Sequence, residues 1–138
     1  FTIIPGTTFE QVKTSLLAIP YLKHTITNMS NKNIMEAIGD FTHEPEGMFM
    51  PETYYYTRGD TDLAVLRRAY DTLVFVLLDA WDNRSKDLPF KESYQALIAA
   101  SLIEKEAYLP AEQPIIAGVL VNRLNKNMLL QFDPTIIY

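Results

Sequence analysis

The chain has 138 residues, of which 48% are hydrophobic and 12% aromatic, as in a folded globular protein rather than a disordered or fibrous one. Its 17 acidic residues outnumber its 12 basic ones, and the net charge of -5 without a Lys and Arg cluster argues against nucleic acid as a partner. Because there is no cysteine, the chain can form no disulfide, thiolate metal site or thiol nucleophile.

The first 40 residues predict a short strand followed by two helices. Residues 1–4 are a β-type run that ends at a Pro-Gly turn. Thr7 and Thr8 are candidate caps for a helix, because the apolar residues that follow recur at helical spacing. Ser30 can cap a second, shorter helix, which Gly39 ends.

The next segments predict a connection and one long helix. Residues 41–59 are rich in Pro, Gly and aromatic residues, and two prolines exclude a continuous helix. We expect a loop or irregular edge strand there, joining two lobes. From a cap at Asp60 or Thr61 to about Trp81, apolar residues recur every three or four positions, which predicts the longest helix of the chain.

Two further helices are predicted, over about residues 91–108 and from Pro110 to about Leu124. The first of these is apolar on all sides, so we expect neighbouring elements to enclose it. Glu104 and Glu106 near its end would then emerge at the wall of the core. Desolvation there raises the pKa of a carboxyl, as a general acid near neutral pH requires.

From the pattern alone, a solvated last helical turn is the commoner explanation for these two glutamates. They lie about 200° apart around a helix, so only one of them can face a given cleft. Glu106 follows Leu102 and Ile103 on a largely apolar flank, which favours it slightly over Glu104.

Several other polar residues are candidates for binding or structure. We expect Asn122 to lie beside Ile115 and Val119 on a buried stripe, where its amide orients a ligand or a carboxylate, or ties down the following loop. An extended segment after it could line a polysaccharide groove or be an ordinary strand; its polar residues are Gln131, Asp133, Thr135 and Tyr138. The two histidines, His24 and His43, lack metal-ligand spacing, so no metal site is expected.

Four ordered motifs resemble a known family, the YceG-like endolytic murein transglycosylases. The segment 46–54 reads EGMFMPETY and is similar to the family's EG-aromatic-FPDTY, with Met50 and Glu52 in place of Phe and Asp. The segment 100–106 reads ASLIEKE and resembles ASIIEKE. VNRL at 121–124 resembles INRL, and LQFDPTIIY at 130–138 resembles LQTDPTVIY.

The resemblance implies an α+β fold. Residues 1–40 would be part of a small LysM-like lobe, and residues 41–138 the N-terminal part of a mainly helical catalytic lobe that is truncated at its C-terminus. Members are anchored by one N-terminal membrane helix and act at the periplasmic face of the bacterial inner membrane. No apolar run here approaches the ~20 residues of such a helix, and both ends look like cut ends of a longer protein.

The resemblance also implies an enzyme that cleaves the MurNAc-GlcNAc β-1,4 bond of peptidoglycan glycan strands and forms 1,6-anhydro ends, limiting strand length, without a cofactor. Glu106 would be the acid/base, with Glu104 as second choice. Asn122, Gln131, Asp133, Thr135 and Tyr138 would bind substrate, cell-wall synthases would be partners, and this segment alone would be inactive if the missing part completes the cleft.

Two alternatives remain open at this point. The chain could be a non-catalytic module that binds peptidoglycan or other division proteins, or a helical scaffold without glycan contact. Cleavage that depends on Glu106 would separate the enzyme from both.

Overall fold

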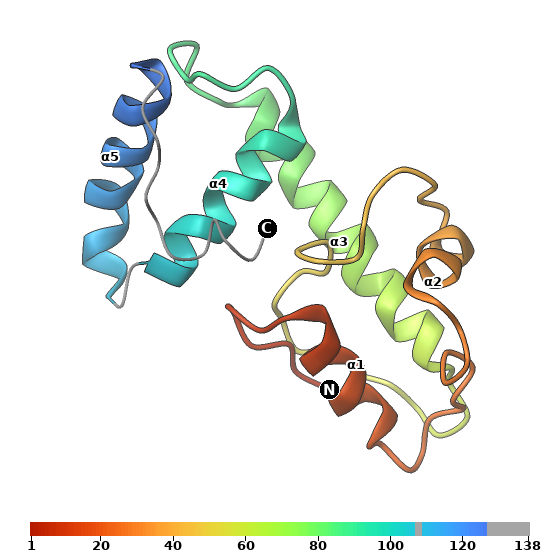
Figure 1. Cartoon of the computed structure of the whole chain (residues 1–138). Helices are drawn as coiled ribbons and strands as arrows, with labels where there is room; N and C mark the ends of the chain where they lie inside the picture. The colour runs from red at the N-terminus through yellow and green to blue at the C-terminus, as the bar shows by residue number, and fades with distance from the viewer. Residues whose placement is uncertain (107–108, 127–138) are drawn as a thin grey trace. The chain divides into compact units, whose positions relative to one another are not determined.

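The computed structural model describes residues 1–106 and 109–126 of the chain (Figure 1). It divides into two compact units, Phe1–Val76 and Leu77–Tyr138. In chain order the elements are α1 (Phe9–Leu17), α2 (Asn31–Ile38), α3 (Asp62–Asp82), α4 (Ser93–Glu106), the short 3₁₀ helix η1 (Pro110–Glu112) and α5 (Gln113–Asn125). The helix α3 begins in the first unit and ends in the second.

The first two helices begin and end where their capping residues predict. The side chain of Thr8 accepts a hydrogen bond from the backbone of Gln11, whose side chain in turn accepts one from Thr8, so α1 starts with a capping box. The side chain of Ser30 caps α2 by accepting a hydrogen bond from the backbone amide of Asn33, without a reciprocal bond. Gly39 ends this helix with φ 106°, a left-handed conformation that favours glycine. Local sequence therefore determines these boundaries.

The predicted α+β fold is wrong for the described residues, which form helices and no strand or sheet. Within residues 1–106 and 109–126, extended segments pair only at two isolated bridges, Thr2 with Thr53 and Lys23 with Thr61. Prolines close to the first bridge, Pro5 and Pro51, lack the N–H that a longer ladder needs. A LysM-like lobe with β strands in residues 1–40 is accordingly not present.

A hydrophobic core fills the first unit and joins α1, α2 and the first half of α3. Phe49 connects α1 with α3, since its ring stacks on Phe9 of α1 at 5.4 Å and meets Tyr70 of α3 edge-on at 6.4 Å. The other buried apolar side chains of this unit are Ile3, Val12, Leu16, Leu22, Ile26, Ile34, Met35, Ile38, Met48, Tyr54, Val65, Leu66, Ala69 and Leu73. Residues 41–59, expected to join two lobes, thus lie inside one unit.

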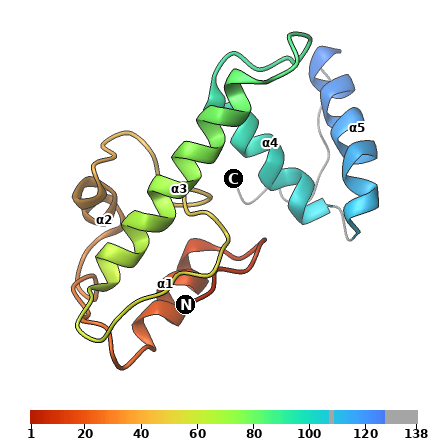
Figure 2. The same ribbon diagram turned by 180° about the vertical axis from the view of Figure 1, so that it is seen from behind.

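The second unit contains a smaller core between α4 and α5, which lie side by side in both ribbon views (Figure 2). Among the described residues, its buried members are Ala99, Leu102 and Leu120. Phe90, Ile98, Ile116 and Leu124 pack around them and are partly buried. Since α5 covers one side of α4, the expected enclosure of α4 on all sides is wrong: Ala100 on that helix is exposed.

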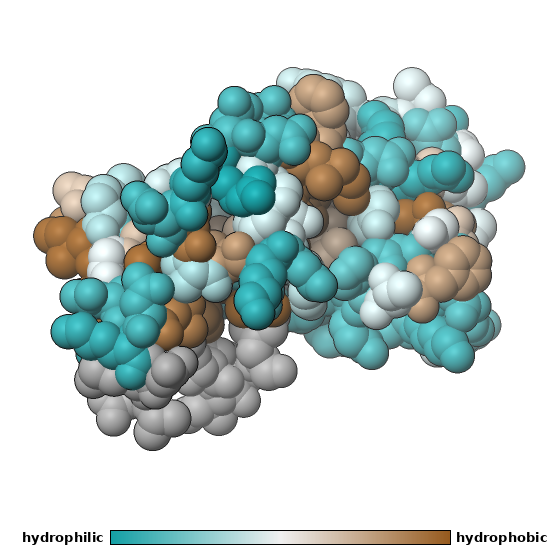
Figure 3. Space-filling view, turned by 90° about the horizontal axis from the view of Figure 1, so that it is seen from above, coloured by the Kyte–Doolittle hydropathy of each residue, from teal (hydrophilic) through white to brown (hydrophobic). Residues whose placement is uncertain are grey.

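Apolar side chains also reach the surface, where the space-filling view shows them among polar residues (Figure 3). The long helix α3 illustrates this, because Phe75 is 75% exposed and Leu78 is 51% exposed. Its predicted apolar stripe is therefore buried at Leu66 and Leu73, and is half-buried or exposed from Val74 onward. Among the described residues, no helix combines the length and apolar character needed to span a bilayer.

Candidate functional site

The helices α4 and α5 are antiparallel neighbours because a short connection containing η1 joins the end of one to the start of the other. The side chain of Gln95 accepts hydrogen bonds from the backbone amides of Lys91 and Glu92, at 2.7 and 3.2 Å, and so organises the start of α4. Pro110 begins η1 and Pro114 lies in the first turn of α5, positions where a missing N–H costs nothing. The two prolines therefore suit the starts of η1 and α5.

The two candidate glutamates lie on different sides of α4. Glu106 is the last residue of the helix and is half-buried. It is about 20° from Ala99 and about 40° from Leu102 around the helix axis, so it extends the buried stripe. Glu104 is exposed and lies about 40° from the exposed Ala100. The structure thus gives the two carboxylates unlike surroundings.

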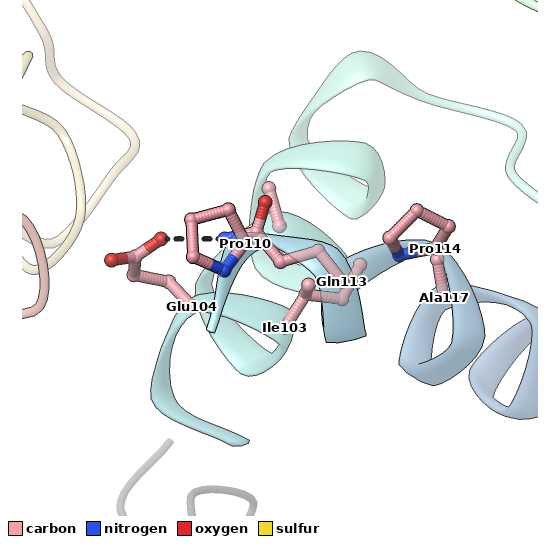
Figure 4. A pocket seen from close by; sticks show the side chains of 7 residues that line it. Ile103, Glu104, Pro110, Gln113, Pro114 and Ala117 are labelled. Atoms are coloured by element: carbon pink, nitrogen blue, oxygen red, sulfur yellow. Dashed lines mark hydrogen bonds between the residues drawn. The ribbon is translucent and has the colours of Figure 1, made fainter. Parts of the chain in front are cut away.

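Glu104 borders an open hollow between α4 and α5, which we call the α4–α5 hollow (Figure 4). Its volume is about 450 Å³, within the range of roughly 300–1,000 Å³ that small-molecule sites occupy. The described residues that line it are Ala100, Ile103, Glu104, Pro110, Gln113, Pro114 and Ala117. Glu106 is not among them.

A hydrogen bond connects two of the polar groups at the hollow. The side-chain amide of Gln113 donates to Oε2 of Glu104 over 3.4 Å, longer than an ordinary hydrogen bond of this kind. We did not predict a role for Gln113 from the sequence. Its position could have indicated this role, because Gln113 lies at the start of α5, shortly after the Glu-Lys-Glu motif and Pro110.

The prediction that Asn122 faces a core is wrong. On α5 the side turned towards α4 carries Ile116, Leu120 and Leu124. Ile115 and Val119, with which Asn122 was expected to be buried, are 70% and 37% exposed, and Asn122 is exposed as well. Its amide is accordingly accessible to a ligand rather than tied into the protein interior.

The remaining predicted groove residues, Gln131, Asp133, Thr135 and Tyr138, lie outside the described residues. Within the described part of the chain, no group of three or more acidic or histidine side chains is arranged to hold a metal ion.

The motif at residues 46–54 is a structural segment of the first unit. Both carboxylate oxygens of Glu46 accept a hydrogen bond from the backbone amide of Phe9, at 3.2 and 3.1 Å, at the start of α1. The backbone amide of Met50 donates to the carbonyl of Ala69 in α3, and the hydroxyl of Tyr54 donates to the carbonyl of Met50. The motif therefore links α1 to α3 through hydrogen bonds.

Two buried aspartates in the first unit were not predicted. Asp40, whose side chain is 4% exposed, accepts hydrogen bonds from the Tyr70 hydroxyl at 2.7 Å and from the backbone amides of Thr42 and His43. Its carboxylate also lies 2.8 Å from Nδ1 of His43. Burial raises the pKa of Asp40, but these hydrogen bonds outweigh it and hold the pKa well below its ordinary value.

The second buried aspartate, Asp62, is fully buried in the first turn of α3. It accepts hydrogen bonds from Thr25, Ile26 and its own helix at Leu63. His24 lies 3.6 Å from this carboxylate. The two histidines of the chain thus each lie beside a buried aspartate.

Comparisons with known proteins identify the family. The sequence matches the YceG-like family along residues 1–138. An endolytic murein transglycosylase of Bacillus subtilis (strain 168) is 36% identical over 115 residues, which are 83% of this chain and 30% of the relative. The enzyme of the same name from Streptococcus pneumoniae serotype 2 (strain D39) is 33% identical over 102 residues, 67% of this chain and 16% of the relative. The chain thus spans less than a third of either relative, and its whole length belongs to the YceG-like family.

Proposed function

We propose that the protein is an endolytic peptidoglycan transglycosylase, which cleaves the β-1,4 bond between MurNAc and GlcNAc and leaves 1,6-anhydro-MurNAc ends. The observation that carries this proposal is the family match along residues 1–138, which includes all of α4 and its glutamates. Relatives that share a third of their aligned residues with this chain bear the name endolytic murein transglycosylase. Internal cuts of this kind would limit the length of new glycan strands.

In this proposal Glu106 performs both proton transfers. Its carboxyl first gives a proton to the bridging oxygen as the bond from that oxygen to C1 of MurNAc breaks. The C6 hydroxyl of the same sugar then forms the new bond to C1 and returns a proton to Glu106. Because the nucleophile is part of the substrate, the reaction consumes no water and needs no second carboxylate, unlike the paired scheme of most glycosidases.

The surroundings of the two glutamates support Glu106 over Glu104. A general acid works best where water is partly excluded, because solvent neither competes for its proton nor screens its charge. Glu106 is half-buried beside the apolar stripe of Ala99 and Leu102, whereas Glu104 is exposed. Glu104 is the second candidate for the same role.

The substrate groove in this proposal continues from α4 to residues further along the chain. The exposed amide of Asn122 can donate to a sugar hydroxyl or acetamido group. Gln131, Asp133, Thr135 and Tyr138 supply additional polar groups and one aromatic face. The substrate places the enzyme outside the cytoplasm, where cell-wall synthases that produce glycan strands would be its partners.

Product analysis tests this proposal. The intact protein is incubated with purified sacculi, and the soluble products are separated and identified by mass spectrometry. We expect fragments that end in 1,6-anhydro-MurNAc, which are lighter by one water than hydrolysis products. Reducing MurNAc ends would instead indicate a hydrolase, and sacculus binding without any cleavage would indicate a non-catalytic peptidoglycan-binding or division-protein module.

A further inference from the structure

The α4–α5 hollow has a polar end and an apolar end. Figure 4 shows the side chain of Glu104 at one end, beside Gln113, and Pro114 and Ala117 towards the other. Ile103 forms part of the wall between them. A ligand group that fits this arrangement must carry hydrogen-bonding atoms at one end and a small apolar group at the other.

The polar end is available for a ligand. The hydrogen bond between Gln113 and Glu104 is 3.4 Å long, so exchanging it for ligand contacts loses little. Glu104 is exposed and its carboxylate is an acceptor only, while the amide of Gln113 both donates and accepts. The pair therefore offers a charged acceptor next to a neutral donor.

We propose that the α4–α5 hollow is a subsite for the 2-acetamido group of an N-acetylhexosamine in the glycan strand. In this subsite the N–H of the acetamido group donates to the carboxylate of Glu104, and its carbonyl oxygen accepts from the amide of Gln113. The methyl group packs against Pro114 and Ala117. This assignment rests on the proposed function for its substrate and adds to it a group that the enzyme recognises.

Charge and shape favour this occupant over other parts of peptidoglycan. The carboxylate of Glu104 repels the lactyl and stem-peptide carboxylates, so anionic groups are excluded from the polar end. A plain hydroxyl would leave the apolar end empty. A free amine would pair with Glu104, yet it would leave the donor of Gln113 without an acceptor and the apolar wall without a contact.

The experiment compares binding of two oligosaccharides to the intact protein, one of β-1,4-linked N-acetylglucosamine and the same oligomer without its acetyl groups. Ala117→Leu fills the apolar end of the hollow. Gln113→Glu removes the donor with little change of shape, and serves if the leucine variant fails to fold. Gly118→Ala is the matched control, since a methyl group added at this exposed neighbour on α5 meets nothing within 4 Å.

We expect the wild type and Gly118→Ala to bind the acetylated oligomer about tenfold more tightly, the equivalent of one or two hydrogen bonds and a buried methyl group. Ala117→Leu and Gln113→Glu should each reduce this preference severalfold or abolish it. An unchanged preference in both variants, or tighter binding of the free amine by the wild type, would overturn the assignment. Sacculus cleavage, measured separately, reports on the proposed function independently of this preference.

Discussion

At the scale of single residues, the carboxylate of Asp40 is a buried charge stabilised by several hydrogen bonds. It combines almost complete burial with hydrogen bonds from Tyr70, Thr42 and His43. Hydrogen bonds to a charged acceptor contribute more than neutral ones, about 1.5–3 kcal/mol each against roughly 1 kcal/mol. Burial first, and the hydrogen bond to Asp40 second, raise the pKa of Tyr70 to about 12.

We therefore predict that Asp40→Asn lowers the free energy of unfolding by roughly 2–3 kcal/mol at pH 7, because an amide cannot accept all of these donors. Urea denaturation followed by circular dichroism measures this. Asp79→Asn, at an exposed carboxylate on α3, is the control and should change stability by less than about 0.5 kcal/mol.

The pH dependence of this contribution follows from the lowered pKa of Asp40. Between the folded and unfolded pKa values the unfolded state binds more protons, so stability rises with pH across that interval. The contribution is complete above about pH 4, the ordinary value for Asp, and is lost as the pH falls further. The difference between wild type and Asp40→Asn should hence shrink below about pH 4; a constant difference would contradict the account.

At the scale of elements, Glu46 joins a loop to the start of α1. A carboxylate at a helix N-terminus is favoured by the helix dipole and by the free backbone amides there. Glu46→Ala should destabilise the protein by about 1–2 kcal/mol and speed hydrogen exchange of the first amides of α1. Glu44→Ala, two residues earlier at an exposed position, is the control. Equal effects of both substitutions would show that the contact with Phe9 contributes nothing.

The packing of α4 against α5 depends on Leu120, which is 1% exposed between the two helices. Replacing a buried leucine by alanine removes its transfer free energy and leaves a cavity, so Leu120→Ala should cost about 2–5 kcal/mol. The adjacent Val119 is 37% exposed, and Val119→Ala should cost less than about 1 kcal/mol. Thermal unfolding of both variants measures the contrast. A larger loss for Val119→Ala would mean that the other face of α5 is the buried one.

Helix boundaries could be predicted from the sequence, whereas the buried face of α5 could not. Thr8, Ser30 and Gly39 act within one helical turn, so a short stretch of sequence contains the whole signal. On α5 two adjacent apolar pairs, Ile115-Ile116 and Val119-Leu120, offer two equivalent stripes. Contact with α4 selects the second member of each pair, and that choice depends on tertiary packing.

The candidate site was predictable in part for the same reason. The Glu-Lys-Glu motif at the end of a helix is local, and α4 ends at Glu106. The expected burial of Asn122 was wrong because we predicted the wrong face of α5 to be buried. The hydrogen bond between Asp40 and Tyr70 could not be predicted because the two residues are 30 positions apart in the sequence. The β-type residues at 1–4 wrongly suggested a strand, because they pair at one bridge only.

At the scale of the whole molecule, the two units contain different motifs of the family. The motif at residues 46–54 supports the first unit through Glu46, Met50 and Tyr54. The second unit contains Glu104, Glu106 and the α4–α5 hollow. The motif in the first unit therefore has a structural role, and the proposed function assigns the proton transfers to the motif in the second unit.

The most direct test of the central claim is peptidoglycan cleavage by the intact protein with Glu106→Gln, beside Glu104→Gln as the matched variant. The glutamine side chains keep the shape of the glutamates and remove the transferable proton. We predict that Glu106→Gln reduces the release of 1,6-anhydro products by at least about 100-fold, as expected when a general acid is lost, with the thermal midpoint unchanged. Glu104→Gln should retain cleavage at saturating substrate, because it changes only the proposed acetamido subsite and leaves the acid/base in place. Full activity in Glu106→Gln, with loss in Glu104→Gln, would contradict the assignment and transfer the acid/base role to Glu104.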